Sequence, residues 1–94
     1  MTTFEWDEKK NRENILKHGV SFEEAQRAFL DENLVLKEDK ANSTDTERRF
    51  YCIGNNGNGI LTVRFTIRDP NIRIIGAGYW RKERKIYEKE NNLH

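Results

Sequence analysis

The amino-acid sequence predicts a small α+β domain, with two N-terminal helices packed on an antiparallel meander of three to four strands and a C-terminal helix closing the fold. Residues 7–30 carry the apolar spacing and the start and stop signals of two helices. Residues 33–80 form strand-length runs separated by turn residues, and residues 81–92 are charged with a thin apolar seam. Because 94 residues suffice for one domain only, we expect residues 1–94 to fold as a single unit.

The first helix is predicted to run from Asp7 to His18. Asp7 is a favoured N-cap residue, and Lys17 and His18 lie in the last turn, where the helix dipole favours cations. Gly19 follows and accepts the left-handed conformation that commonly ends a helix.

A second helix is predicted to start directly afterwards. Ser21-Phe22-Glu23-Glu24 has the pattern of a capping box, in which Ser21 accepts a hydrogen bond from the Glu24 amide and the Glu24 side chain reaches back. Phe22, Ala25 and Phe29 recur at helical spacing, so we expect them to form the buried stripe of this helix.

Four segments have the composition of strands, namely residues 33–39, 48–55, 60–69 and 72–80. The polar residues 40–47 predict a loop between the first two. Residues 56–59, Asn-Gly-Asn-Gly, predict a hairpin turn because both residue types accept positive φ.

The segment 60–69 alternates cleanly between apolar and polar residues. One face carries Leu61, Val63, Phe65 and Ile67. The other face carries Thr62, Arg64, Thr66 and Arg68. We therefore expect one face in the core and the other face wet and basic. If Ile67 pairs with Ile72 in the next strand, Arg73 lies beside Thr66 and adds a third guanidinium to that face.

The last segment, residues 81–92, is predicted to be a helix of modest stability. A helix of this length is marginal in water by itself, so docking through Ile86 and Tyr87 must hold it.

The net charge of +1 conceals an uneven distribution. Residues 1–47 hold 7 Lys and Arg against 12 Asp and Glu, whereas residues 48–94 hold 10 against 4. A basic half that includes Arg-Lys-Glu-Arg-Lys is typical of proteins that bind a polyanion. Two solvated faces of opposite charge would have the same composition, so both interpretations stay open.

The single cysteine, Cys52, excludes an internal disulfide and suits a reducing compartment. No apolar run reaches the roughly 20 residues of a membrane span. The N-terminus lacks the pattern of a secretion signal, and we therefore expect a cytoplasmic protein with no membrane partner.

One cysteine and two histidines make no ligand cluster, so we expect no metal and no cofactor. The remaining reactive side chains suit attack of an RNA 2′-hydroxyl on its own phosphate, because the RNA supplies both reactants. Arginine pairs with phosphate oxygens and stays charged, and histidine transfers protons near neutral pH. Each candidate also has a structural alternative: His18 as a helix-dipole partner, the strand arginines as solvated groups, and Tyr79 and Trp80 as core residues.

Three stretches of the chain together resemble the BrnT family of bacterial toxins. They are "FEWDEKKNRENILKHGVSFEEA", "RFYCIGN" and "ILTVRFTIRDPNIRIIGAGYWRKERKIYEKE". The positions that match the family signature in type and spacing are Trp6-Asp7, Lys10, Asn14, Lys17-His18-Gly19-Val20 and Phe22. The resemblance implies a RelE-like fold and a metal-independent ribonuclease toxin. It also implies a BrnA-type antitoxin with a ribbon-helix-helix DNA-binding part, through which alone the toxin would meet DNA.

The sequence departs from this pattern at the end of its last strand. Where many relatives have Ser-Ala-Arg, this chain has Gly76-Ala77-Gly78, so Arg81 or Arg64 would have to substitute for the missing arginine. We expect catalysis from His18, Arg64, Arg68, Arg81 and Tyr87. We expect RNA binding from Lys17, Arg73, Tyr79, Trp80, Lys82, Arg84 and Lys85. A non-catalytic nucleic-acid-binding module that uses the same basic face is the alternative, and a dimer within the antitoxin complex is left open.

Overall fold

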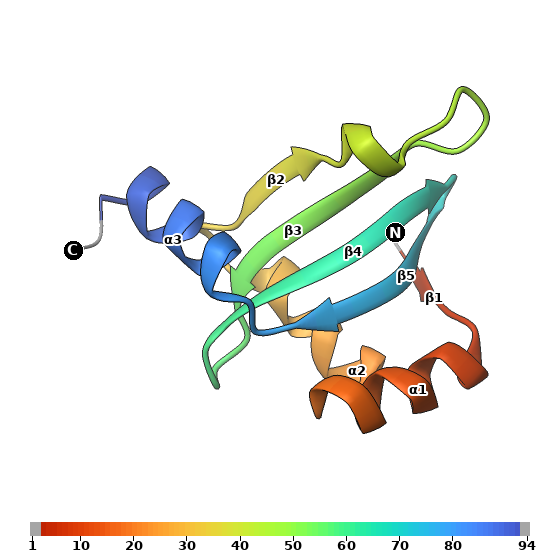
Figure 1. Ribbon diagram of the computed structural model, residues 1–94, viewed down its shortest axis with the longest axis horizontal. Coiled ribbons are helices and arrows are strands. Elements are labelled where there is room, and N and C mark those ends of the chain that lie inside the picture. The colour runs from red at the N-terminus through yellow and green to blue at the C-terminus, as the bar shows by residue number, and fades with distance from the viewer. Residues whose placement is uncertain (1–2, 93–94) are drawn as a thin grey trace.

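The structure is a computed structural model that describes residues 3–92, and its centre is a five-stranded mixed sheet with helices on both faces (Figure 1). The strand order is β1-β5-β4-β3-β2. Along the chain the elements are β1 (Thr3–Glu5), α1 (Glu8–His18), α2 (Phe22–Ala25), the 3₁₀ helix η1 (Gln26–Leu30), β2 (Val35–Glu38), the 3₁₀ helix η2 (Lys40–Asn42), β3 (Arg49–Asn55), β4 (Ile60–Arg68), β5 (Asn71–Gly78) and α3 (Arg81–Glu90).

The predicted α+β class is confirmed, and the predicted strand count is too low. Strands β2 to β5 pair antiparallel in chain order, as expected of a meander. The fifth strand, β1, pairs parallel with β5, with Phe4 opposite Ile72. A strand of three residues is too short to show alternation in the sequence, so pattern analysis missed it.

The predicted helix signals at the N-terminus are present, with one correction. The Asp7 side chain accepts hydrogen bonds from two first-turn amides of α1, and Gly19 ends the helix at a φ of 68°. Ser21 accepts from the Glu24 amide as expected. The Glu24 carboxylate does not reach back, because it accepts hydrogen bonds from Asn56 and Tyr79 instead. The helical turn also tightens to 3₁₀ geometry after Ala25.

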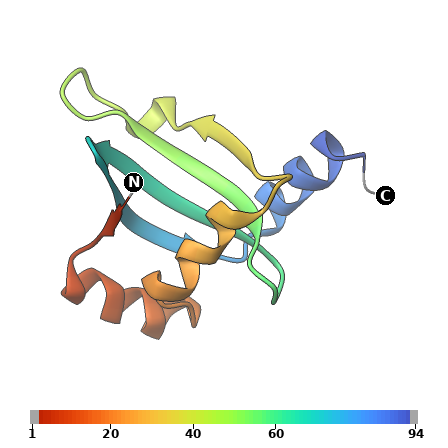
Figure 2. The same cartoon turned by 180° about the vertical axis from the view of Figure 1, so that it is seen from behind.

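The main core lies between the sheet and the layer formed by α2 and η1, which covers one face (Figure 2). Its buried residues are Val20, Phe22, Ala25, Ala28, Cys52, Leu61, Val63, Phe65, Ile74 and Ala77. Phe29 packs against them, so the predicted helical stripe is confirmed. Cys52 is fully buried, and burial raises the pKa of its thiol to about 12, which makes it an inert core residue.

Helix α1 lies along the edge of β5 beyond the point where β1 ends. Its only buried residue, Asn14, donates hydrogen bonds to the carbonyls of Val20 and Ala77, both at 2.9 Å. The amide of Ala77 donates back to the Asn14 side-chain oxygen at 3.1 Å. One side-chain amide therefore replaces the strand that would otherwise satisfy this part of the sheet edge.

The other face of the sheet is covered only at one end, by α3 (Figure 1). Tyr87 packs there with Val35 and Ile53, and Ile86 joins from the rim, as expected for the docking of this helix. No helix within residues 3–92 is long and apolar enough to cross a membrane.

The predicted register between β4 and β5 is confirmed, since Ile67 pairs with Ile72 and Thr66 pairs with Arg73. The polar face of β4 is less exposed to solvent than predicted. Thr62 and Thr66 are buried, and the Thr66 hydroxyl donates to the Arg48 carbonyl.

Ile67 was expected in the core, yet 56% of its surface is exposed. It lies at an open apolar groove of about 410 Å³ lined by Phe29, Leu34, Leu36, Lys37, Glu38, Phe50, Phe65, Ile67 and Ile72. The helical layer ends at Leu30, and it leaves this part of the sheet uncovered.

The substitution Asn14→Ala should lower the free energy of unfolding by about 2–4 kcal/mol, because it leaves the backbone groups of Ala77 and Val20 without partners. Asn14→Asp should cost more, since a carboxylate would face two carbonyls. Urea denaturation followed by circular dichroism measures both effects. Asn58→Ala, at an exposed hairpin position, is the control, and a loss below about 1 kcal/mol for Asn14→Ala would contradict the assignment.

Candidate active site

A groove of about 330 Å³ lies between the N-terminal turn of α3 and the uncovered part of the sheet. Its lining residues are Glu38, Asp39, Lys40, Ala41, Asn42, Tyr51, Thr62, Arg64, Lys82 and Glu83. Tyr51 on β3 is the cross-strand partner of Arg64 on β4, which places both side chains on the same face. We call this hollow the Arg64 groove.

The guanidinium of Arg64 is available to an anionic ligand. Its side chain is exposed, and it forms no ion pair with any residue of the described range 3–92. Its guanidinium carbon lies over the Trp80 ring, 5.1 Å from the ring centre.

The N-terminus of α3 adds positive potential to the Arg64 groove. Trp80 occupies the N-cap position and makes no side-chain capping hydrogen bond. The first-turn amides of residues 81–83 therefore carry the partial positive charge that attracts anions to helix N-termini. Lys82 comes from the same turn and lines the groove. The arrangement suits a phosphate group.

The floor of the Arg64 groove contains a polar atom without a partner. Thr62 is only 2% exposed, and its hydroxyl makes no hydrogen bond within the described part of the chain. A buried hydroxyl without a partner loses the free energy of its hydration. A ligand oxygen or a water reaching the floor of the groove would satisfy it.

Four side chains that can accept or donate a proton through a carboxylate or a phenol share the groove with Arg64, namely Glu38, Asp39, Tyr51 and Glu83. Glu38 is paired with Arg48, and Asp39 accepts a hydrogen bond from Asn42, which leaves Tyr51 and Glu83 without a side-chain partner among residues 3–92. Neither was among the site residues expected from the sequence. A signal for Tyr51 did exist, because a four-residue hairpin turn at 56–59 aligns Tyr51 with Arg64. No comparable signal marked Glu83, whose position depends on how α3 docks.

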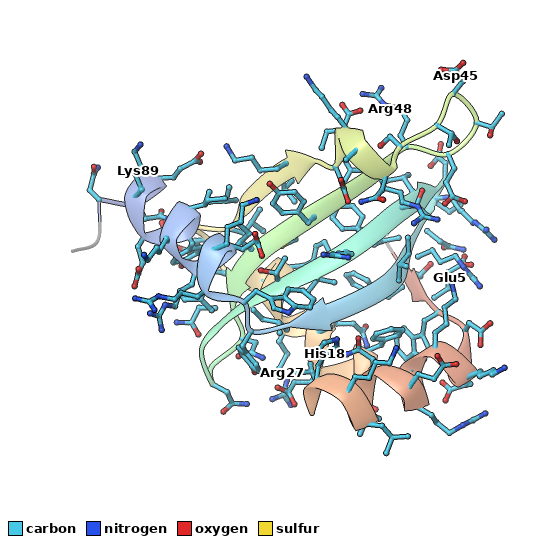
Figure 3. All side chains as sticks on the ribbon, in the orientation of Figure 1. Glu5, His18, Arg27, Asp45, Arg48 and Lys89 are labelled. Carbon is cyan, nitrogen blue, oxygen red and sulfur yellow. The ribbon has the colours of Figure 1, made fainter. Side chains whose placement is uncertain are left out.

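The expected catalytic residue His18 lies next to the Arg64 groove but does not line it. It ends α1, and its ring packs against the Trp80 ring in an edge-to-face arrangement with centroids 5.3 Å apart. Figure 3 shows His18 near the end of α1 beside the sheet. His18 and Lys17 line a separate shallow hollow beside α1. Trp80 therefore contacts both His18 and Arg64.

The three guanidinium groups that the sequence predicted to converge are not brought together. Arg68 lies four residues further along β4, roughly 13 Å away at the usual strand rise, where it lines another hollow together with Asp45 and Arg48. Arg73 has the predicted register, but it forms an ion pair with Glu5 at 2.8 Å. Hydrogen bonds from Asn71 and Arg73 lower the pKa of Glu5, so Arg73 is committed to a structural contact.

Tyr87, another expected catalytic residue, is buried beneath α3 at 4% exposure. Its hydroxyl donates to Asp31 at 2.5 Å. Burial and the Asp31 carboxylate raise the pKa of Tyr87 to about 12. The structure therefore places Tyr87 in the core, away from the Arg64 groove.

A second hollow of about 420 Å³ lies between the hairpin tip and α3, and its lining includes Trp80, Arg81 and Arg84. Tyr79 also lines it, although the Tyr79 hydroxyl donates to Glu24 and accepts from Asn56. Tyr79 thus ties the hairpin to α2. The remaining expected RNA-binding residue, Lys85, is exposed on α3.

A family model described as "Ribonuclease toxin, BrnT, of type II toxin-antitoxin system" matches residues 6–83. The matched range contains every residue that lines the Arg64 groove. A comparison with curated proteins gives no match.

The substitution Tyr87→Phe removes the hydrogen bond to Asp31 and should lower the free energy of unfolding by about 1–2 kcal/mol. This value is at the low end for hydrogen bonds to charged groups, because Asp31 is partly exposed. Urea denaturation measures the loss. Tyr51→Phe, whose hydroxyl lines the groove, should change stability by less than about 0.5 kcal/mol.

The loss in Tyr87→Phe should also depend on pH. The raised pKa means that the Tyr87 contribution is full below the tyrosine reference of about 10 and is lost as the pH rises through about 12. Burial raises the pKa of Asp31, but hydrogen bonds from Tyr87 and two amides outweigh it and leave the pKa lowered. The Asp31 contribution is therefore present above its unfolded pKa and lost as the pH falls through the folded one. A loss that grew between pH 10 and 12 would contradict this account.

Proposed function

Because the chain belongs to the BrnT family of ribonuclease toxins of type II toxin-antitoxin systems, we propose that it cleaves RNA in the Arg64 groove without a metal ion. The observation that carries the proposal is the Arg64 guanidinium, which has no ion-pair partner within residues 3–92, beside the uncapped N-terminus of α3. Both features favour an anion, and both lie within or beside the range matched by the family.

The proposed reaction uses a nucleophile from the substrate. The RNA 2′-oxygen bonds to the adjacent phosphorus, and the bond from phosphorus to the 5′-oxygen breaks. The products are a 2′,3′-cyclic phosphate and a 5′-hydroxyl. Negative charge grows on the non-bridging phosphate oxygens as this occurs, and preorganised donors stabilise it best. Arg64 and Lys82 supply those donors, and the α3 amides add their partial charge.

Two protons must move, one from the 2′-hydroxyl and one to the departing 5′-oxygen. We assign the first to the Glu83 carboxylate and the second to the Tyr51 hydroxyl, because both line the Arg64 groove, whereas the other two carboxylates that line it, Glu38 and Asp39, already have side-chain partners. The groove therefore favours Glu83 and Tyr51 over the expected His18 and Tyr87.

The second hollow supports a path for RNA beyond the cleaved phosphate. Arg81 and Arg84 line it, and it adjoins the Arg64 groove at the N-terminus of α3. We assign these two arginines to backbone phosphates, with Lys85 and Lys17 as outer contacts. Arg84 is only loosely held by Glu88 at 4.0 Å, so its charge remains accessible.

A type II toxin-antitoxin family implies a protein antitoxin as partner. We propose that this antitoxin is of the BrnA type, with a ribbon-helix-helix DNA-binding part, and that the pair acts in the cytoplasm. Support comes from the family resemblance and from the small core of a 94-residue chain, which gains from additional burial.

Arg64→Ala should lower the rate of RNA cleavage by about 10²–10³-fold, the usual cost of removing one preorganised oxyanion donor. Arg68→Ala is the matched control, since it removes an exposed arginine from the same strand outside the groove, and it should change the rate by less than about threefold. The assay incubates purified protein with RNA and a chelator and identifies the product ends.

Several outcomes of that assay are decisive. If Glu83 accepts the proton from the 2′-hydroxyl, Glu83→Gln should lower the rate of RNA cleavage by about 10²–10⁴-fold. Equal losses for Arg64→Ala and Arg68→Ala would remove the Arg64 groove as the site. Salt-sensitive RNA binding without cyclic phosphate ends would instead support the alternative, a non-catalytic nucleic-acid-binding module.

Addition of the antitoxin should raise the melting temperature. At a free antitoxin concentration of 1,000 times Kd, the expected stabilisation is about 4 kcal/mol. For a domain of this size that corresponds to a rise above about 10 °C. Scanning calorimetry of the toxin, the antitoxin and their mixture measures it. An unrelated ribbon-helix-helix protein is the control, and no shift with the cognate protein would refute the partnership.

A further inference from the structure

The Trp80 ring occupies a space that Gly78 of β5 leaves open. Gly78 is in register with Thr62, and Gly76 is in register with Arg64. Because neither glycine has a side chain, the surface of β5 beside Arg64 is bare backbone. A methyl group at Gly78 would lie 2.6 to 2.9 Å from three atoms of the Trp80 ring, which is closer than real contacts allow. The ring therefore lies directly on the strand.

Contacts on further sides fix the orientation of the same ring. The Arg64 guanidinium carbon lies over it at 5.1 Å from the ring centre. His18 packs against it with an interplanar angle of 77°. Gly78, His18 and Arg64 thus occupy much of the surroundings of the ring, and Trp80, which is partly exposed, can meet RNA, its expected ligand, only from the second hollow that it lines.

We propose that Trp80 is a positioning residue, seated on Gly78, that holds the Arg64 guanidinium at the groove. The inference rests on the proposed ribonuclease function for its effect on rate. An exposed arginine without an ion pair samples many rotamers, and a cation–π contact favours the bound set by roughly two- to fivefold. Small misplacements of a catalytic group cost much more than this, because the reaction depends on geometry.

The proposal also gives a structural reason for glycine at the last position of the Gly76-Ala77-Gly78 segment. A side chain at Gly78 would expel the Trp80 ring, and Arg64 would lose its support. Glycine at this position is therefore the condition for bringing Trp80 and Arg64 together on the sheet surface.

The kinetic test compares Trp80→Ala, Trp80→Phe, Gly78→Ala and Arg64→Ala with the combined Arg64→Ala/Trp80→Ala form. Trp80→Ala and Gly78→Ala should each lower kcat by about 10-fold with KM changed less than about threefold, and Trp80→Phe should keep most activity. In the Arg64→Ala background, Trp80→Ala should cost less than about twofold, because its partner is already absent. Independent, multiplying losses would overturn the proposal, as would a rise in KM alone.

A second measurement does not depend on activity. The Trp80 ring current should shift the Arg64 side-chain resonances in nuclear magnetic resonance spectra, and Trp80→Ala and Gly78→Ala should abolish the shift. Trp6→Phe, at the other tryptophan, should leave these resonances and kcat unchanged. Folding of every variant is checked by thermal melting. Unchanged Arg64 resonances in a folded Trp80→Ala protein would overturn the proposal.

The two measurements separate this inference from the function on which it rests. A wild-type protein that never cleaves RNA, yet shows the Trp80-dependent Arg64 shift, would refute the ribonuclease assignment and support the contact. A wild-type protein that cleaves RNA but shows no such shift would support the ribonuclease assignment and refute the contact between Trp80 and Arg64.

Discussion

The pairing of β4 with β3 on one side and β5 on the other determines what the groove contains. Through this pairing Arg64 faces Tyr51 across one strand gap and Gly76 across the other. Side chains alternate along a strand, so a slip of one residue would turn Arg64 into the core and Val63 or Phe65 into solvent. The burial of Leu61, Val63 and Phe65 against the helical layer makes such a slip costly. The same hydrophobic contacts that stabilise the fold therefore hold the guanidinium on the open face.

The uneven coverage of the two faces explains why the proposed site lies at this place. One face packs under α2 and η1, whereas α3 covers only one end of the other. At the boundary between covered and open sheet, the N-terminal turn of α3 meets the side chains of β3 and β4. The positive potential of the helix N-terminus lies there beside the Arg64 guanidinium and the Thr62 hydroxyl, neither of which has a charged or hydrogen-bonding side-chain partner in the described part of the chain.

Part of the excess positive charge in residues 48–94 is paired with carboxylates of residues 1–47 within the fold. Three ion pairs join an acid of the first half to an arginine of the second half, namely Arg48–Glu38, Arg49–Glu47 and Arg73–Glu5, whereas Lys37–Glu90 runs the opposite way. The basic half thus serves partly as an internal partner of the acidic half, which neither of the two interpretations of the composition anticipated. Arg64, the arginine that we propose for the phosphate, forms no ion pair with any of the residues that the structure describes.

The sequence by itself determined the local features. Caps and glycines mark the limits of α1, alternation identifies β4, and the Asn-Gly hairpin aligns β3 with β4, because each is governed by the conformational preference of a few adjacent residues. The tertiary structure alone decided which distant groups meet: β1 beside β5, Asn14 on the edge of β5, Arg73 with Glu5, Tyr87 with Asp31, and Trp80 between His18 and Arg64. These contacts depend on how layers dock and on free energies shared among many weak interactions, and no local pattern encodes them.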